Sequence, residues 1–409
     1  MNPFIYPTEP QFINRIVDGI ERARRRANPG STSDPLPPTR EQLESLLSCC
    51  FTASLESEER RAVEFTVAFF HEKDRAFPYP MQIPFCPRNL ARLSVALDPY
   101  RSRICVMPAE SGLSIHGLDR LTEHDPFQDS PQMRDGLAIR VLGPGILLVR
   151  FGLSTIFTYR RGRVRFWADT PPYMVDNLVR TALSFCFDRG ATLGQECSNW
   201  LFRRSVRRVT QIMRSHGHGG TLLIVPPGMG LGDRVIPGSG RFAPTNVVTT
   251  IKEAFARQLE DELRHRATWE QRGREGVVVG PLPAAGLSSE LEWLGDLTGT
   301  DGMTVVQRDF TLLGFGVFFN MNDTAEAPTE VSVTDLCNEG PDSDHWPTSA
   351  AQIGGARHQS AAITCRHMPG AVAIVASQDG MLTSMTCESV TPPTNVVNAF
   401  RHLELLLDF

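Results

Sequence analysis

A short glycine-rich motif in the C-terminal half combines residue types that bind phosphate groups. It has the sequence GGARHQS and spans Gly354–Ser360. Glycines let the backbone approach a ligand closely, and a helix N-terminus offers free N–H groups and a positive dipole end. Arg357 and His358 add strong donors, and Ser360 lies three residues after Arg357 on the same helix face. The motif predicts a triphosphate-binding helix start; the alternative is a surface loop whose arginine forms a salt bridge.

A second candidate is the dipeptide Asp301-Gly302, which precedes a predicted strand. A carboxylate at the edge of a sheet can hold a divalent metal through one oxygen, or position an attacking hydroxyl group. Gly302 lets a ligand approach the backbone. The alternative is an ordinary turn, because Asp-Gly is among the commonest turn dipeptides.

The elements around these two motifs alternate between helices and short strands. Apolar runs predict strands at residues 221–225, 303–307, 311–319, 371–376 and 381–385. Apolar residues at helical spacing predict helices at about 198–214, 251–263, 291–297, from 357 onward, and at 396–407. Residues 323–352 are polar and contain Pro and Asp, so we expect a loop there. The C-terminal half therefore reads as an α/β domain with a mixed sheet.

The N-terminal half mixes helices and strands in a different pattern. Thr39 and Gln42 form a capping-box pattern ahead of an apolar helical stripe. Alternating apolar residues predict strands at 63–67 and 146–151, and two further strands around Arg160–Arg163 predict a hairpin. This half is predicted to be an α+β domain, so the fold class is α/β, and α+β overall.

Length and composition limit the class of protein. The chain has 409 residues, and the simplest division is into domains at residues 1–190 and 195–409. A net charge of −5 argues against a dedicated nucleic-acid binder. The N-terminal segment lacks the basic and apolar regions of a secretory signal, and arginines interrupt the apolar stretches before they reach the length of a membrane span. We therefore expect a cytoplasmic protein with no membrane or nucleic-acid partner.

Cysteine and histidine spacing predicts no metal site. The nine cysteines are irregularly spaced and include no C-x-x-C pair, so we expect them to be reduced and mostly buried. His216 and His218 are separated by one glycine, with no further ligand at recognisable spacing. We interpret this pair as a polar turn at a helix end.

Three segments in a fixed order resemble the diadenylate cyclase (DisA-type) domain. They are GGTLLIV at 219–225, DGMTVVQRDFTLLGFGVFF at 301–319, and GGARHQSAA with AIVASQDG between 354 and 380. That family carries a glycine-initiated first strand, an Asp-Gly-Ala motif, a Gly-Thr-Arg-His-Arg motif and a final Val-Ser-Gln/Glu turn in the same order. The resemblance covers roughly residues 195–409.

This resemblance implies a metal-dependent reaction on ATP. In the family, two domains face each other, each with one ATP and a divalent cation, and they release pyrophosphate to give a cyclic dinucleotide. Asp301, beside Gly302, matches the carboxylate that binds Mg²⁺ or Mn²⁺ and promotes attack, while Arg357 and His358 match the pair that grips phosphates. The implied partners are ATP, the cyclic product and further copies of the chain in a homo-oligomer. Other implied nucleotide contacts are Gly220, Thr221, Met303, Leu313, Gly355, Ala356, Gln359, Ser360 and Ser377.

Three positions depart from the family pattern. Met303 replaces the alanine of Asp-Gly-Ala, Ala356 replaces the threonine before Arg-His, and Gln359 replaces the second arginine. These changes narrow the pocket, remove a hydroxyl group and remove a cation. They keep open a second interpretation, in which the domain is a catalytically weak or inactive nucleotide-binding sensor module.

Segments of the N-terminal half carry a separate resemblance. They are ASLESEERRAVEFTVAF at 53–69, NLARLSVALDPYRSRICVMPAESGLSIHGL at 89–118, and the hairpin around 148–167. They resemble the DACNV domain, a predicted sensor region found fused to cyclase-like domains. The resemblance implies that the N-terminal domain regulates the C-terminal one.

Overall fold

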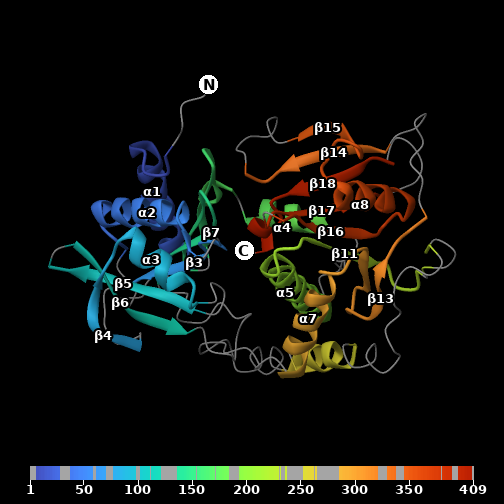
Figure 1. The fold of residues 1–409 in the computed structure, drawn as a ribbon, viewed down its shortest axis with the longest axis horizontal. Helices are drawn as coiled ribbons and strands as arrows, with labels where there is room; N and C mark the ends of the chain where they lie inside the picture. The colour runs from blue at the N-terminus through green and yellow to red at the C-terminus, as the bar shows by residue number, and fades with distance from the viewer. Residues whose placement is uncertain are drawn as a thin grey trace. The chain divides into compact units, whose positions relative to one another are not determined.

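A computed structural model gives the fold of the chain as two compact units (Figure 1). The units consist mainly of Met1–Pro171 and of Pro172–Leu336 with Gly340–Asp408. The domain boundary predicted at 190–195 stays a prediction. The structure describes residues 6–27, 37–58, 61–70, 77–97, 102–110, 112–120, 136–152, 154–170, 172–183, 193–229, 231, 235–236, 252–261, 263–264, 285–320, 329–337, 345–378, 380–388 and 395–407.

The described residues of the first unit combine three helices with a large sheet. Its helices are α1 (Pro10–Ala27), α2 (Arg40–Ser54) and α3 (Pro87–Ser94), with a 3-10 turn η3 (Trp167–Asp169). Its strands are β1 (Ser57–Glu58), β2 (Arg61–Ala62), β3 (Phe65–Phe69), β4 (Phe77–Pro84), β5 (Ser102–Ala109), β6 (Gly112–Arg120), β7 (Leu137–Gly143), β8 (Ile146–Phe151), β9 (Ser154–Arg160) and β10 (Arg163–Phe166). Eight of these strands form one sheet in the order β10-β9-β8-β7-β3-β5-β6-β4.

The predicted helix and hairpin of this unit are confirmed. The Thr39 hydroxyl accepts from the backbone N–H of Gln42, and the Gln42 side chain accepts from the backbone N–H of Thr39, which closes the capping box of α2. Helix α2 buries its apolar face, including Leu43 and Leu46, in a core shared with α1 and the sheet. Strands β9 and β10 form the hairpin, with Arg160 paired to Arg163.

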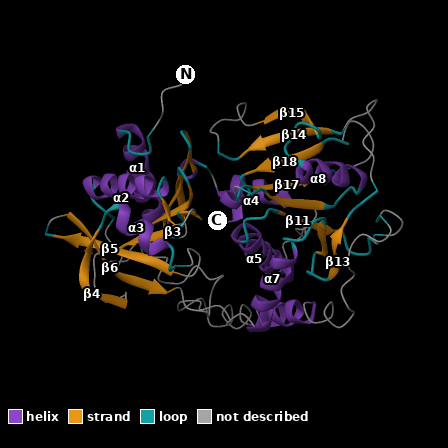
Figure 2. Ribbon diagram, in the orientation of Figure 1, coloured by secondary structure: helices purple, strands orange, loops and turns teal. Residues whose placement is uncertain are grey.

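The second unit is also a layered α/β assembly (Figure 2). Its helices are α4 (Pro172–Leu183), α5 (Leu193–Ser215), α7 (Ala285–Leu297), α8 (Ala356–His367) and α9 (Glu404–Leu407), and residues 252–261 are also helical. Its strands are β11 (Gly220–Val225), β12 (Met303–Gln307), β13 (Leu312–Val317), β14 (Glu330–Asp335), β15 (His345–Ser349), β16 (Val372–Ala376), β17 (Leu382–Thr386) and β18 (Val397–Arg401).

The eight strands in the described part of the second unit form one mixed sheet, in the order β13-β12-β11-β16-β17-β18-β14-β15. The pairs β11–β12 and β14–β18 are parallel, and the other neighbours are antiparallel. Helix α8 packs against the central strands β16 and β17. Leu223 and Val375 share a core with α8, whereas the alternate residues Leu222 and Ile374 are buried outside that core. Because strand side chains alternate between faces, the central strands are buried on both sides and read as continuous apolar runs.

Two secondary-structure predictions for this unit are wrong. The segment expected to be a loop at 323–352 contains β14 and β15, which pair as an antiparallel hairpin. Val331 and Val333 are buried and alternate with half-buried polar residues, a two-residue period hidden by the polar composition around it. The helix expected at 396–407 is strand β18 followed by the single turn α9. There, Val397 and Ala399 face inward at strand spacing.

The expectation about the cysteines holds for the described part of the chain. The described cysteines form no disulfide, and all of them except Cys86 are buried. Burial raises the pKa of Cys365 to about 12, so this thiol stays protonated at neutral pH. Helix α5 ends at Ser215, directly before the His216-Gly-His218 turn, as predicted.

Candidate nucleotide site

A cavity of about 920 Å³ lies in the second unit. Its walls come from the starts of β11 and β12, the end of β13, the first turns of α8, and the end of β16 with the turn that follows it. The lining residues that the sequence predicted are Thr221, Asp301, Gly302, Met303, Gly355, Ala356, Arg357, His358, Gln359, Ser360 and Ser377. Segments that are far apart in the sequence therefore line the same cavity.

Two predicted residues are not part of this lining. Gly220 begins β11, where an added Cβ atom would lie 2.5 Å from the carbonyl oxygen of Thr298. This glycine is required for close packing of the strand against the end of α7. Leu313 lies in β13 and packs, partly buried, against the hydrophobic core. The nucleotide contacts that the resemblance implies for Gly220 and Leu313 stay a prediction.

Asp301 is the most exposed charged group of the site. Its side chain is 93% exposed, and its Oδ1 atom lies 3.7 Å from Nη2 of Arg357. Gly302, the next residue, has φ +95°, and an added Cβ would lie 2.6 Å from the carbonyl carbon of Gly316. Only glycine fits this close approach of two backbones without a shift. The turn thus fixes Asp301 at the mouth of the cavity, ahead of β12.

Arg357 stands on the first turn of α8 and reaches back towards β11. An added Cβ at Gly219 would lie 3.1 Å from Nη1 of Arg357, so this glycine leaves room for the guanidinium group. The N-cap residue of α8 is Gly355, and no side chain caps the helix there. The first N–H groups of α8 and the Arg357 guanidinium therefore offer donors on the same side of the cavity.

His358 is held more deeply than its neighbour. Its side chain is buried, and its Nε2 atom lies 3.3 Å from the hydroxyl oxygen of Thr383 on β17. An added Cβ at Gly354 would lie 3.0 Å from the His358 ring, so the preceding loop packs closely over it. These contacts make His358 an anchor for the start of α8, in addition to lining the cavity.

The other polar side chains of the motif, on the first turns of α8, donate to backbone carbonyls. The side-chain amide of Gln359 donates to the carbonyl oxygens of Gly354 at 2.9 Å and Ala351 at 3.3 Å. The Ser360 hydroxyl donates to the carbonyl of Arg357 at 3.1 Å. Gln359 therefore closes the glycine loop, a role that its position in the motif did not indicate.

Another part of the cavity wall comes from the residues that follow β16. The Ser377 hydroxyl donates to the carbonyl of Met381 at 3.1 Å. Arg214, near the end of α5, donates from Nε to the carbonyl of Gly380 at 2.7 Å. These bonds fix the turn that carries Ser377 and Gln378 into the lining.

The apolar wall of the cavity includes residues that sequence reasoning missed. Ile236, Phe318 and Phe319 line it together with Met303. The backbone N–H of Ile236 donates to the carbonyl of Phe318 at 2.8 Å, and both side chains are exposed. The run of apolar residues at the end of the predicted strand 311–319 was the available signal. Its last residues continue past β13 to the rim of the cavity.

His216 lies close to this site without lining it. Its Nε2 atom is 3.3 Å from the Thr298 hydroxyl oxygen, and its Nδ1 atom accepts from the backbone N–H of His218 at 3.2 Å. Burial lowers the pKa of His216, and the nearby Arg357 guanidinium adds to this effect. The imidazole is therefore neutral at pH 7 and contributes no positive charge to the site.

Asp301 has the donor chemistry for a hard divalent cation. Magnesium prefers oxygen ligands and usually retains several waters, together with one or two carboxylates and substrate phosphates. Within the described residues, no group of three potential His, Cys, Asp or Glu ligands includes Asp301. A cation at Asp301 would take its other ligands from phosphate oxygens and water, which the open position of this side chain permits.

Residues 32–120 match the family model described as "Probable sensor domain DACNV". The match lies within the first unit and supports the resemblance found in the N-terminal segments. No curated protein and no solved structure matches the sequence. Among the described helices, none combines the length and the apolar character needed to cross a membrane. The cyclase resemblance of residues 195–409 stays a prediction.

Proposed function

We propose that the chain is a metal-dependent nucleotidyl cyclase that condenses two ATP molecules into cyclic di-AMP or a related cyclic dinucleotide. The observation that carries the proposal is the gathering of Asp301, Arg357 and the open start of α8 around one cavity. Its volume of about 920 Å³ falls within the roughly 300–1,000 Å³ typical of small-molecule sites. The DACNV match supports a sensor role for the N-terminal unit, which in this proposal regulates the cyclase.

The two sides of the cavity suit the two parts of a nucleotide. Met303 and Phe319 offer an apolar surface for a base. Arg357 and the N–H groups of α8 offer cationic and dipolar donors for phosphate oxygens. Binding would therefore be directional, with the triphosphate at the helix start.

Phosphoryl transfer depends mainly on positioning and on compensation of charge. In each of two steps, the 3′-oxygen of one nucleotide bonds to the α-phosphorus of the other, and the bond from the α-phosphorus to the bridging oxygen of pyrophosphate breaks. The hydroxyl proton leaves to Asp301 or to solvent, and pyrophosphate carries away the bonding electron pair. Mg²⁺ or Mn²⁺ held by Asp301 would supply positive charge to the phosphate oxygens. Arg357 stabilises the negative charge that develops there.

The exposure of Asp301 favours action between two copies of the chain. A carboxylate that is 93% exposed is directed outward, where the nucleotide of a facing copy can reach it. Ile236 and Phe318 are exposed apolar residues of the same lining and would be covered in such a pair. The proposed enzyme is therefore a homo-oligomer with face-to-face cyclase units, and an isolated chain completes no product.

A nucleotide-binding sensor module without turnover is the second candidate. The bonds of Gln359 to Gly354 and Ala351 favour it, because this position supplies a loop brace rather than a cation for phosphate. Ala356 likewise supplies no hydroxyl group. These features weaken the support for turnover more than the support for binding.

One product assay separates the two candidates. The full chain is incubated with ATP, GTP or both, in Mg²⁺ and separately in Mn²⁺, and the products are identified by mass spectrometry. The cyclase proposal predicts a cyclic dinucleotide whose formation per chain rises with protein concentration, since two copies must meet. Measurable ATP binding without pyrophosphate release in either metal would establish the sensor module instead.

A further inference from the structure

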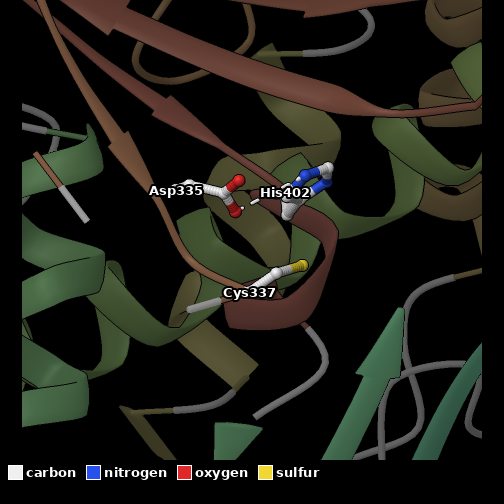
Figure 3. Close-up of side chains that lie close together, drawn as sticks. All are labelled: Asp335, Cys337 and His402. Atoms are coloured by element: carbon white, nitrogen blue, oxygen red, sulfur yellow. Dashed lines mark ion pairs between the residues drawn. The ribbon is translucent and has the colours of Figure 1, made fainter. Parts of the chain in front are cut away.

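A second group of potential ligands lies at the ends of β14 and β18 (Figure 3). These strands are parallel neighbours, and Asp335, the last residue of β14, pairs in register with Arg401, the last residue of β18. His402 follows β18 directly, and Cys337 follows Asp335 by two residues. The parallel register thus brings a carboxylate, a thiol and an imidazole from two distant parts of the sequence to one place.

The geometry of the three side chains suits a shared cation. One ligand atom from each lies within 4.8 Å of the other two, and all three residues are buried. Nε2 of His402 lies 3.6 Å from Oδ1 of Asp335. This separation exceeds the roughly 2.7–3.2 Å of an N–H···O hydrogen bond. Two ligands that are each about 2.0–2.1 Å from a tetrahedral zinc ion lie roughly 3.3 Å apart, close to the separation observed here.

The other ring nitrogen of His402 is oriented by a carboxylate. Nδ1 of His402 lies 3.3 Å from Oε1 of Glu404, and Oε2 of Glu404 accepts from the backbone N–H of Leu382 at 3.0 Å. His402 has φ +67°, a left-handed conformation that places its ring between the two acidic residues. Metal-binding histidines usually have a carboxylate, a carbonyl or water at the ring nitrogen that does not hold the metal, and Glu404 is placed for that role.

We infer that Asp335, Cys337 and His402 bind one zinc-class divalent transition-metal ion, with Glu404 as the group that positions His402. A thiolate and an imidazole favour zinc or a similar borderline-soft cation over Mg²⁺. The cation would hold the ends of β14 and β18 together. It is separate from the cation proposed at Asp301, and it does not depend on the cyclase activity.

The end of β18 has a route to the nucleotide cavity of the second unit. Arg401, the register partner of Asp335, donates from Nη2 to the carbonyl of Ile353 at 2.7 Å. Ile353 directly precedes Gly354-Gly355, the glycines before α8. A cation that fixes the end of β18 would therefore also fix the residue that supports the phosphate-binding loop.

The alternative is a buried network of hydrogen bonds in which His402 bridges Asp335 and Glu404 without a metal. Such a network needs no thiol, whereas the proposed site uses Cys337 as a ligand. The Cys337 thiol therefore discriminates between the metal site and the metal-free network. A spectroscopic signal from a metal–sulfur bond tests directly whether this thiol binds a metal.

The experiment uses the full chain purified without chelators. Its metal content is measured by inductively coupled plasma mass spectrometry, and the metal is then exchanged for Co²⁺. We expect close to one zinc per chain and a sulfur-to-cobalt charge-transfer band after exchange. The near-isosteric variant Cys337→Ser should lose this band while its circular dichroism is retained. The matched control Cys86→Ser, at a half-buried cysteine in the first unit, should keep it.

Two results would overturn the inference. A folded wild-type chain that contains no transition metal and takes up neither Zn²⁺ nor Co²⁺ would show that the three groups form only a hydrogen-bonded network. A charge-transfer band that survives in Cys337→Ser would place the bound cobalt elsewhere. If Cys337→Ser does not fold, Cys337→Ala is measured in the same way, and a band that survives in it has the same meaning.

Discussion

Two aspartates of the second unit form pairs of nearly the same length in opposite surroundings. Asp301 lies 3.7 Å from Arg357, with side chains 93% and 36% exposed. Asp335 lies 3.6 Å from His402, with side chains 3% and 6% exposed. Exposed ion pairs contribute little stability, because water and salt screen their charges. A buried polar group that loses its partner is costly, because water cannot replace the lost interaction.

The difference indicates two uses for the same chemistry. The exposed pair can separate at little cost, which leaves Arg357 for a phosphate and Asp301 for a cation. The buried pair is held by packing and by Glu404, and it suits a permanent structural role. The predictions below test this contrast, beginning with the largest expected effect.

Removal of the buried imidazole should destabilise the protein strongly. His402→Gln takes the ring from between two buried carboxylates, and a buried polar group left without its partner costs about 1–3 kcal/mol for each carboxylate. For a unit of this size, that corresponds to a fall in the unfolding midpoint of roughly 10 °C. Differential scanning calorimetry compares the unfolding midpoints of His402→Gln and Asp301→Asn. The midpoint of Asp301→Asn should equal that of the wild type, because Asp301 is exposed. Equal unfolding midpoints in the two variants would contradict the proposed difference between the exposed and the buried pair.

The turn that carries Asp301 should tolerate no side chain at Gly302. In Gly302→Ala, the new Cβ would meet the Gly316 backbone, and φ +95° disfavours any L-residue. Strain of this kind costs about 1–3 kcal/mol. Gly355→Ala is the matched control, because φ is −69° there and no atom lies within 4 Å of the added Cβ. Urea denaturation should show a clear loss only in the first variant. A neutral Gly302→Ala would mean that the close approach at Gly316 relaxes easily.

Replacement of Arg357 should weaken nucleotide binding without affecting stability. Arg357→Lys keeps the charge and loses the forked pair of donors. Hydrogen bonds to charged groups contribute about 1.5–3 kcal/mol, so the Kd for ATP should rise at least about tenfold. Isothermal titration calorimetry measures this change, with the exposed helical variant Arg264→Lys as the control. Unchanged affinity in Arg357→Lys would remove this residue from the phosphate site.

A smaller effect is expected from pH. Burial lowers the pKa of His216, with contributions from His218 and Arg357 and an opposing one from Asp296. Below the ordinary histidine pKa of about 6.5, the unfolded chain therefore binds more protons than the folded chain. Stability should be fully present above about pH 6.5 and fall as the pH drops towards the lowered pKa. His216→Gln should flatten this part of the urea-midpoint profile. An identical slope in wild type and variant would assign the pH dependence to other groups.

The sequence was most informative where the chemistry is local. The GGARHQS motif consists of two glycines and the first residues of the helix that follows them. Its backbone geometry therefore follows from neighbouring residues, and α8 begins at Ala356 as expected. The capping box at Thr39 is local in the same sense. The grouping of these residues with Asp301 required the order of motifs along the chain, because spacing alone does not place two distant segments together.

The Asp335–Cys337–His402 cluster could not be predicted in this way. It depends on the parallel register of β14 and β18, and both strands were misassigned from the sequence. Their two-residue periods are short, and each lies among polar or helix-compatible residues. The hydrogen bonds from Gln359 to the glycine loop could not be predicted from the sequence either. They depend on the direction of the side chain, whose amide donates to the carbonyl of Gly354.

The most direct test of the proposed function is a paired measurement on Asp301→Asn. ATP binding and pyrophosphate release are followed in the same preparations of wild type and variant, in Mn²⁺ and in Mg²⁺, with Asp261→Asn as a carboxylate control outside the cavity. The account predicts that the wild type and the control release pyrophosphate and form a cyclic dinucleotide, whereas Asp301→Asn retains ATP binding and releases none. Full cyclisation by Asp301→Asn would contradict the role assigned to this carboxylate.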